Sequence, residues 1–215
     1  RASPVTVSGL ANATAIGAGE YHSLAARADG TAVAWGSNGS GELGDGTLAT
    51  RLSPVPITGL SGVVALEAGL SHSLALDRNG TLFAWGGNGS GQLGDATAGY
   101  RAAPAPVPGI APVAEFSTGY FHAVASRADG SAWGWGYNVD GEVGDGTLLG
   151  RNAPVVVLRR DGGGSVAAND WFLDLRPDVA SSIPADKVPV FLVVASPAGG
   201  DVTARIRYRA QDVGT

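Results

Sequence analysis

Three glycines with the spacing of a nucleotide-binding turn stand near the start of the chain, directly before a carboxylate. They are Gly39, Gly41 and Gly44, and Asp45 follows them. A Gly-x-Gly-x-x-Gly turn can hold a pyrophosphate when it links a strand to a helix, because the helix N-terminus then faces the phosphate. A loop rich in glycine and aspartate can instead bind Ca²⁺. The sequence around the loop decides between these chemistries.

That sequence supports neither chemistry. No helical pattern follows Asp45, and the third occurrence of the turn has Val139 in place of the first glycine. Asp45 and Glu42 together supply at most two carboxylates, which is too few for a tight Ca²⁺ site. We interpret the loop as a turn in which Asp45 accepts backbone N–H groups and the glycines adopt positive φ. We expect no catalytic residue, no cofactor and no metal here.

The histidines are the next candidates for chemistry. His22, His72 and His122 are the only ones, and they recur at the same place in a repeated pattern. A catalytic base is rarely copied three times, so we expect buried imidazoles that bond backbone groups and tie loops of adjacent repeats together. Three histidines on one metal are the alternative, but no carboxylate recurs beside them. A serine follows the first two histidines and Ala123 follows the third, which argues against a Ser–His nucleophile.

These residues are positioned by a repeat of 50 residues. The units are 1–50, 51–100 and 101–150, and a partial fourth unit covers 151–158. Each unit contains short strands rich in alternating small and apolar residues, separated by turns. The pair Asp29-Gly30 predicts a hairpin turn in which both residues have positive φ. No stretch shows a sustained helical period, so the sequence predicts an all-β protein.

A period near 50 residues with several strands per unit indicates β-propeller blades. The repeated residues resemble the regulator of chromosome condensation repeat, and the resemblance extends over residues 1–158. It implies four-stranded blades from a seven-bladed propeller. The first unit carries it in Gly19, His22-Ser23-Leu24, Asp29-Gly30, Trp35-Gly36, Asn38, Gly41-Glu42-Leu43-Gly44 and Pro54-Val55.

Three units are too few to close such a ring, and two interpretations follow. The chain is a piece of a longer propeller, or three-blade units of several chains meet in a ring or filament. After the repeats, 159–169 resembles a linker, and 170–215 contains strand-like segments. We expect a small β-sandwich-like domain there, either complete or continuing past Thr215.

Positions that vary between the repeats are the candidates for binding a partner, because variation on a constant scaffold is typical of a binding surface. Aromatic side chains provide large contact areas at such surfaces. Alternate residues of a late strand form a second candidate, either a basic patch for an acidic partner or a solvated face. The candidate residues are Tyr21, Tyr100, Tyr120, Phe121, Tyr137, Arg205, Arg207 and Arg209.

The charge distribution narrows the class of partner. Residues 1–150 contain 6 Arg, no Lys and 12 Asp and Glu, whereas 151–215 contain 8 Lys and Arg and 7 Asp. An acidic, lysine-free repeat region is poorly suited to nucleic acid or an anionic membrane. The sequence has no cysteine and no apolar run long enough to span a bilayer.

We therefore expect a non-catalytic binding or scaffold module of a secreted or surface-displayed bacterial protein. Its partners would be other proteins or copies of itself, in adhesion or self-assembly. The family resemblance implies two alternatives, a guanine-nucleotide exchange factor for a small GTPase and a proteinaceous enzyme inhibitor.

Overall fold

The structure is a computed structural model that describes residues 3–158. The predicted linker 159–169, the predicted domain 170–215 and the basic strand with Arg205, Arg207 and Arg209 lie outside the described residues. Between residues 3 and 158 all regular structure is β-strand, in agreement with the predicted all-β class. That range contains no helix able to cross a membrane.

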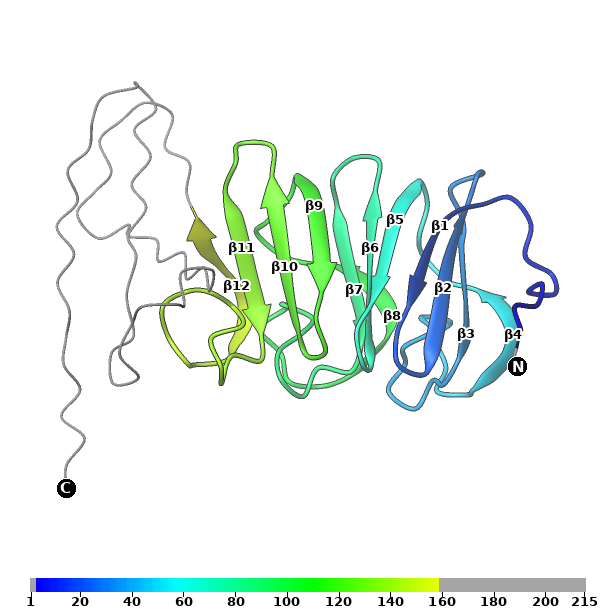
Figure 1. Cartoon of the computed structure of the whole chain (residues 1–215), viewed down its shortest axis with the longest axis horizontal. Helices are drawn as coiled ribbons and strands as arrows, with labels where there is room; N and C mark the ends of the chain where they lie inside the picture. The colour runs from blue at the N-terminus through cyan, green and yellow to red at the C-terminus, as the bar shows by residue number, and fades with distance from the viewer. Residues whose placement is uncertain (1–2, 159–215) are drawn as a thin grey trace, which may run out of the picture. The chain divides into compact units, whose positions relative to one another are not determined.

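The strands form three antiparallel four-stranded sheets, each built from consecutive strands (Figure 1). This is the arrangement of propeller blades, as the sequence predicted. The first blade consists of β1 (Ala13–Ala18), β2 (His22–Arg27), β3 (Ala32–Gly36) and β4 (Arg51–Pro56). The second consists of β5 (Val63–Ala68), β6 (His72–Asp77), β7 (Leu82–Gly86) and β8 (Arg101–Pro106). The third consists of β9 (Val113–Thr118), β10 (His122–Arg127), β11 (Ala132–Gly136) and β12 (Arg151–Leu158).

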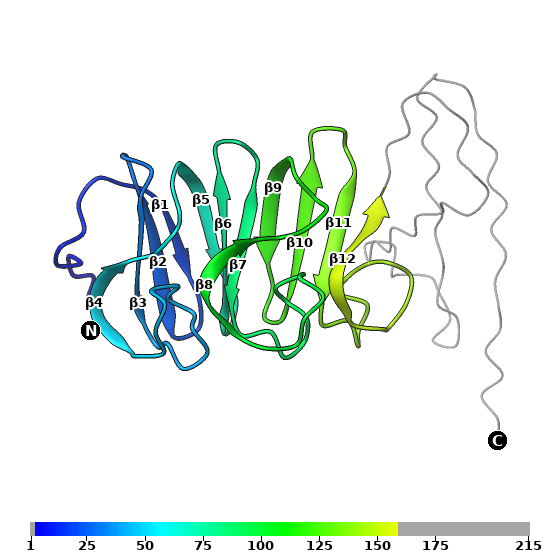
Figure 2. The same cartoon turned by 180° about the vertical axis from the view of Figure 1, so that it is seen from behind.

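Blade boundaries differ from the boundaries of the sequence units. Each blade takes its fourth strand from the start of the next unit, so β12 is the partial fourth unit at 151–158 (Figure 2). Residues 4–7 correspond in sequence to β4 but form no strand. No third strand of a preceding blade lies beside them in the described part of the chain, so their backbone has no sheet to join.

The predicted hairpins are present, but with a different turn. Gly30 has φ +80°, whereas Asp29 does not have positive φ. The Gly30 N–H donates to the carbonyl of Arg27 at 2.9 Å, and the Asp29 carboxylate accepts the N–H of Thr31 at 2.9 Å. This is a three-residue loop with one left-handed glycine, so the expected pair of positive φ values was wrong.

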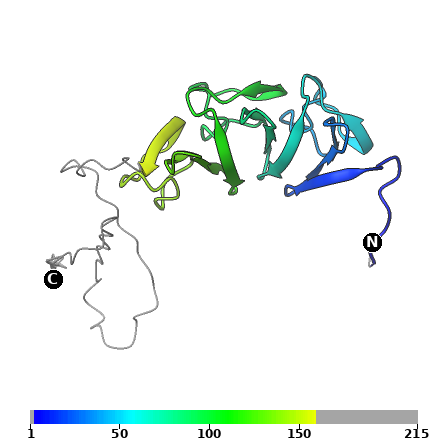
Figure 3. The same ribbon diagram turned by 90° about the horizontal axis from the view of Figure 1, so that it is seen from above.

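The hydrophobic cores lie between blades and not within them. Even-numbered residues of β2 and β3, such as Leu24 and Ala34, pack against Leu66, Ala75 and Trp85 of the second blade. The same positions of the second blade form an equivalent core with the third. Figure 3 shows the three blades following one another along an arc. The two apolar clusters lie at the two boundaries between them.

Candidate functional site

The glycine-rich loop is organised around a buried asparagine. Asn38 is completely buried, and its amide donates to the carbonyls of Thr47 and Ala49 at 3.0 and 3.2 Å and to Asp45 at 3.2 Å. Its side-chain oxygen accepts the N–H of Leu43 at 2.9 Å. One side chain therefore closes the whole loop, and its polar atoms are occupied by the protein itself.

Asp45 is also occupied by the protein. Its carboxylate accepts the Thr47 N–H at 2.9 Å and the Thr47 hydroxyl at 2.7 Å, and pairs with Arg51 at 2.8 Å. Burial opposes ionisation of Asp45, but the hydrogen bonds from Thr47 and the Arg51 guanidinium outweigh it, so the pKa is lowered. This confirms the predicted Asp-based turn. Sequence reasoning missed Arg51, although an arginine at 1, 51, 101 and 151 was a visible signal.

The other two blades repeat this loop. Asn88 and Asp95 take the same roles in the second blade, and Asn138 and Asp145 take them in the third. Residues 3–158 contain no cluster of three or more metal-ligating side chains. In both blades the asparagine side chain bonds to groups of its own loop, as Asn38 does in the first blade.

The histidine of the first blade makes a contact that crosses to the second. The Nε2 of His22 lies 2.8 Å from the hydroxyl of Ser73, and that hydroxyl donates to the carbonyl of Glu42 at 2.8 Å. The same carbonyl accepts the indole N–H of Trp85 at 2.7 Å. Because the Ser73 proton goes to a carbonyl, His22 must donate through Nε2–H. Ser73 is therefore not activated as a nucleophile.

This geometry corrects part of the histidine prediction. His22 does tie adjacent blades together, but through a serine hydroxyl and not directly through a backbone group. Burial lowers the pKa of His22 to about 4. Burial, with the neighbouring His22 and His122, lowers the pKa of His72 to about 3. Neither ring nitrogen of His72 has a hydrogen-bond partner within residues 3–158, and its Nε2 lacks the partner of His22 because Ala123 stands where the serine would be.

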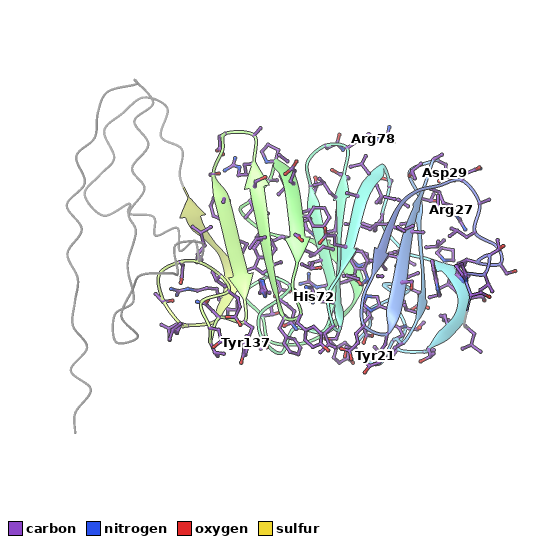
Figure 4. The ribbon with its side chains drawn as sticks, in the orientation of Figure 1. Tyr21, Arg27, Asp29, His72, Arg78 and Tyr137 are labelled. Carbon is purple, nitrogen blue, oxygen red and sulfur yellow. The ribbon has the colours of Figure 1, made fainter. Side chains whose placement is uncertain are left out.

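The predicted aromatic residues lie at one end of the blades. This end carries the loop between the first and second strands of each blade and the loop between the third and fourth strands. Tyr120 packs edge-on against Phe121 with ring centroids 5.3 Å apart, and Phe121 lies 6.2 Å from Tyr137. Figure 4 places Tyr21 and Tyr137 at this same end. We call Tyr21, Tyr120, Phe121 and Tyr137 the aromatic face.

A polar contact joins the first and third blades across this face. The hydroxyl of Tyr120 donates to the carboxylate of Glu20, and this bond, with a second from Tyr21, lowers the pKa of Glu20. The Leu70 N–H of the middle blade donates to the Tyr120 carbonyl at 3.1 Å. Loops 100 residues apart in the chain thus form one continuous surface. Glu20 takes part in this contact, although it was not among the candidate binding residues predicted from the sequence.

The remaining candidates are not part of the aromatic face. Tyr100 is exposed at the end of the β7–β8 loop, at the same end of the blades, but it has no ring contact with the aromatic face in the described structure. The three predicted arginines lie beyond residue 158. The opposite end of the blades carries the β2–β3-type hairpins, where Figure 4 shows Arg27, Asp29 and Arg78. A role in binding stays a prediction for Tyr100 and for Arg205, Arg207 and Arg209.

Two family descriptions match the blades. Both are named regulator of chromosome condensation (RCC1) repeat. One matches 13–42, 63–92 and 113–142, and the other matches 29–76 and 79–126. Together they reach into all three blades, and the first begins at the first strand of each blade. No curated protein matches the chain.

Solved structures share the fold. Human WBSCR16 is 23% identical with a TM-score of 0.59, over 66% of this chain and 36% of its own. Prp20p from Saccharomyces cerevisiae is 24% identical with a TM-score of 0.61, over 70% of this chain and 39% of its own. A structure of Kap60 bound to yeast RCC1 (Prp20) matches at 26% identity and TM-score 0.62, over 70% and 38%. The chain thus spans well under half the length of these proteins.

Proposed function

This chain belongs to the regulator of chromosome condensation repeat family, and from that premise we propose that it is a binding module whose aromatic face docks a protein partner. The observation that carries the proposal is the contrast within each blade. The Asn38-type loops are constant and internally bonded, whereas the residues of the aromatic face differ between blades, and Tyr21, Tyr120 and Tyr137 are exposed. A rigid scaffold with variable aromatic residues suits protein recognition.

The solved relatives support a protein as the partner. One describes the binding of Prp20p to Gsp1p and histones, and another contains Kap60 bound to yeast RCC1. The acidic carboxylate of Glu20 beside exposed tyrosines favours a partner segment with basic and apolar groups, because cations bind well over aromatic rings. We further propose a scaffold role without catalysis, in a secreted or surface-displayed bacterial protein.

The docking proposal is tested by removing the aromatic face. We expect a Tyr120→Ala, Phe121→Ala, Tyr137→Ala variant to lose at least about tenfold in affinity for proteins captured by the wild-type chain, because aromatic anchors dominate interfaces. A Val64→Ala variant is the control, since Val64 is an exposed residue on a strand of the middle blade. Equal retention of every captured protein by the triple variant and the control would contradict the proposal.

Exchange activity on a small GTPase is the second candidate, supported by the Gsp1p-binding relative. It predicts that the chain accelerates release of a fluorescent guanine nucleotide from a GTPase. Because the chain spans 39% of that relative's length, release at the spontaneous rate would leave the binding proposal intact and remove this candidate.

A further inference from the structure

The hairpin turn of the middle blade contains two adjacent residues that can react with each other. The chain has three Asn-Gly pairs, which begin at Asn38, Asn79 and Asn88. We propose that Asn79 is a site of spontaneous deamidation, whereas the fold protects the other two pairs. This turn lies between β6 and β7, at the end of the blades opposite the aromatic face (Figure 4). The inference therefore goes beyond the binding proposed for that face.

The reaction needs no reagent except water. The backbone nitrogen of Gly80 attacks Cγ of Asn79 and forms a C–N bond. The proton that this nitrogen loses is taken up by the side-chain nitrogen, which leaves as ammonia. Water then adds a hydroxyl group to either carbonyl carbon of the cyclic imide and a proton to the ring nitrogen. Opening at one carbonyl gives aspartate, and opening at the other gives isoaspartate, in which the chain continues through the side-chain carbon.

The two pairs in the glycine-rich loops are held away from this reaction. Asn38 and Asn88 are 0% and 2% exposed. The side-chain oxygen of each accepts the backbone N–H of a leucine five residues ahead, at 2.9 and 3.0 Å. The side-chain nitrogen of each donates to a threonine carbonyl nine residues ahead, at 3.0 Å in both loops. Ring closure would leave these buried groups without partners, so the fold opposes it.

Asn79, in contrast, is exposed and loosely held. Within residues 3–158 its side chain makes one hydrogen bond, from Nδ2 to the Asp77 carboxylate at 3.4 Å. The contact that opposes the reaction is in the backbone. The Gly80 N–H donates to the Asp77 carbonyl at 3.1 Å, and this bond must open before the nitrogen can attack. Exposed backbone bonds at a hairpin tip open far more readily than the whole fold, so the turn slows the reaction without preventing it.

The fold also requires the glycine of this pair. Gly80 has φ +81°, a conformation that other residues rarely adopt. A Cβ at this position would lie 2.8 Å from the Cβ of Pro112, which precedes β9 of the third blade. A larger residue is therefore excluded at position 80. Because glycine has no side chain to hinder ring closure, the reactivity of the turn depends on which residue stands at position 79.

The aspartate product is a residue that the other two blades already have at this position. Asp29 and Asp129 correspond to Asn79, and each accepts the N–H and the hydroxyl of the residue two positions ahead. In the middle blade Asp77 accepts the Thr81 N–H instead, at 2.8 Å. Deamidation to aspartate thus gives a turn that the fold accommodates, with a second carboxylate two residues from Asp77. Isoaspartate also lengthens the backbone of the turn.

Ageing the folded 215-residue chain in neutral buffer tests this inference. Peptic digestion in acid stops the reaction, and mass spectrometry with fragmentation then measures the conversion of amide to carboxyl at each Asn-Gly pair. We expect conversion at Asn79 to be at least about tenfold faster than at Asn38 or Asn88, because opening a hairpin tip costs less than extracting a buried side chain. Methylation by an isoaspartate-specific methyltransferase detects the β-linked product.

The same chain unfolded in urea is the matched control. Without the fold the three pairs present the same two residues to each other, so their rates should become similar. Asn79→Gln should remove the methylated product from the folded chain, and Asn79→Asp is the chromatographic standard for the aspartate form. Conversion at Asn79 that is no faster than at Asn38 and Asn88 in the folded chain overturns the inference. A difference of the same size in urea also overturns it, because the protection would then not come from the fold.

Discussion

At the scale of single residues, the polar side chains that first suggest chemistry are structural. Asn38 closes its loop through bonds to three carbonyl or carboxylate oxygens and one N–H. Asp45 is held by Thr47 and Arg51. Side chains that are completely satisfied inside a loop have no free lone pair or proton for a ligand, and their loss should reduce stability more than binding.

The buried asparagine of the middle blade provides a direct test. We expect Asn88→Ala to lower the free energy of unfolding by about 2–4 kcal/mol, because the Leu93 N–H and the Thr97 carbonyl lose their buried partner. Urea unfolding followed by tryptophan fluorescence measures the change. Asn79→Ala is the matched control at an exposed turn, and it should change stability little. Equal effects of the two substitutions would contradict this role.

The buried histidines predict how stability depends on pH. Their folded pKa values, about 4 for His22 and about 3 for His72, lie below the usual 6.5, so the unfolded state binds protons first. Stability should be constant above pH 7 and fall as the pH drops below about 6.5, by about 2 kcal/mol per histidine at pH 5. Urea midpoints at pH 7 and pH 5 measure this loss. The His72→Gln variant should lose about half of the pH dependence; an unchanged dependence would contradict the assignment.

At the scale of elements, the turn before the second strand of each blade is set by a close approach of backbone to imidazole. A Cβ at Gly69 would lie 2.2 Å from Cε1 of His72 and 2.7 Å from the carbonyl oxygen of Gly119. Only glycine allows the ring to lie against this turn. The repeated Gly-x-x-His spacing was visible in the sequence, but its physical reason was not, because the ring direction depends on the neighbouring blade.

A pair of glycine substitutions separates this contact from general effects of glycine. We expect Gly69→Ala to lower the free energy of unfolding by about 2–4 kcal/mol, because the imidazole or the third blade must move. Gly39→Ala should be neutral or slightly stabilising, since nothing lies within 4 Å of a Cβ there and φ is not positive. Thermal unfolding compares the two. A larger loss of stability for Gly39→Ala than for Gly69→Ala would show that the close contact between Gly69 and His72 does not determine the effect of the substitution.

The strands and blades could be predicted from the sequence, whereas the detailed turn geometry and the limits of each blade could not. The hairpins, the all-β class and the propeller blades followed from the period of 50 residues and the Asp-Gly or Asn-Gly turns. The turn geometry at Asp29 was wrong, because a three-residue loop and a two-residue loop use the same residues. The blades are offset from the repeat units, since the fourth strand of each blade comes from the start of the next unit and the repeat has no sequence signal for which segment completes which sheet.

At the scale of the whole described structure, stability resides between blades, because both hydrophobic cores are interfaces between successive sheets. Proteins of this kind are stabilised by contacts between neighbouring repeats, so a middle blade has two such contacts and a terminal blade has one. The same residue type should therefore contribute differently according to its blade. The aromatic face is likewise a property of the series, since its members come from different blades.

Equivalent tryptophans test this dependence. We expect Trp85→Phe to lower the free energy of unfolding by about 1–3 kcal/mol, because the buried Glu42 carbonyl loses the indole donor. Trp35→Phe should have a smaller effect in dilute solution, where the Trp35 indole has no acceptor in the described residues. Urea unfolding at low protein concentration provides the comparison. Equal losses would indicate that Trp35 is already paired within the monomer.

The sequence by itself determined the repeat, the strand class, the family and the structural role of the Asp45 loop, because these depend on residues close together in the chain. It also singled out Tyr21, Tyr120, Phe121 and Tyr137 as variable, although their role in binding stays a prediction. Only the tertiary structure decided which of them lie together. Contacts such as Glu20 with Tyr120, or Trp85 with the Glu42 carbonyl, join positions 100 and 43 residues apart. Contacts between residues so far apart in the chain depend on how the sheets pack, and local patterns of residues do not determine them.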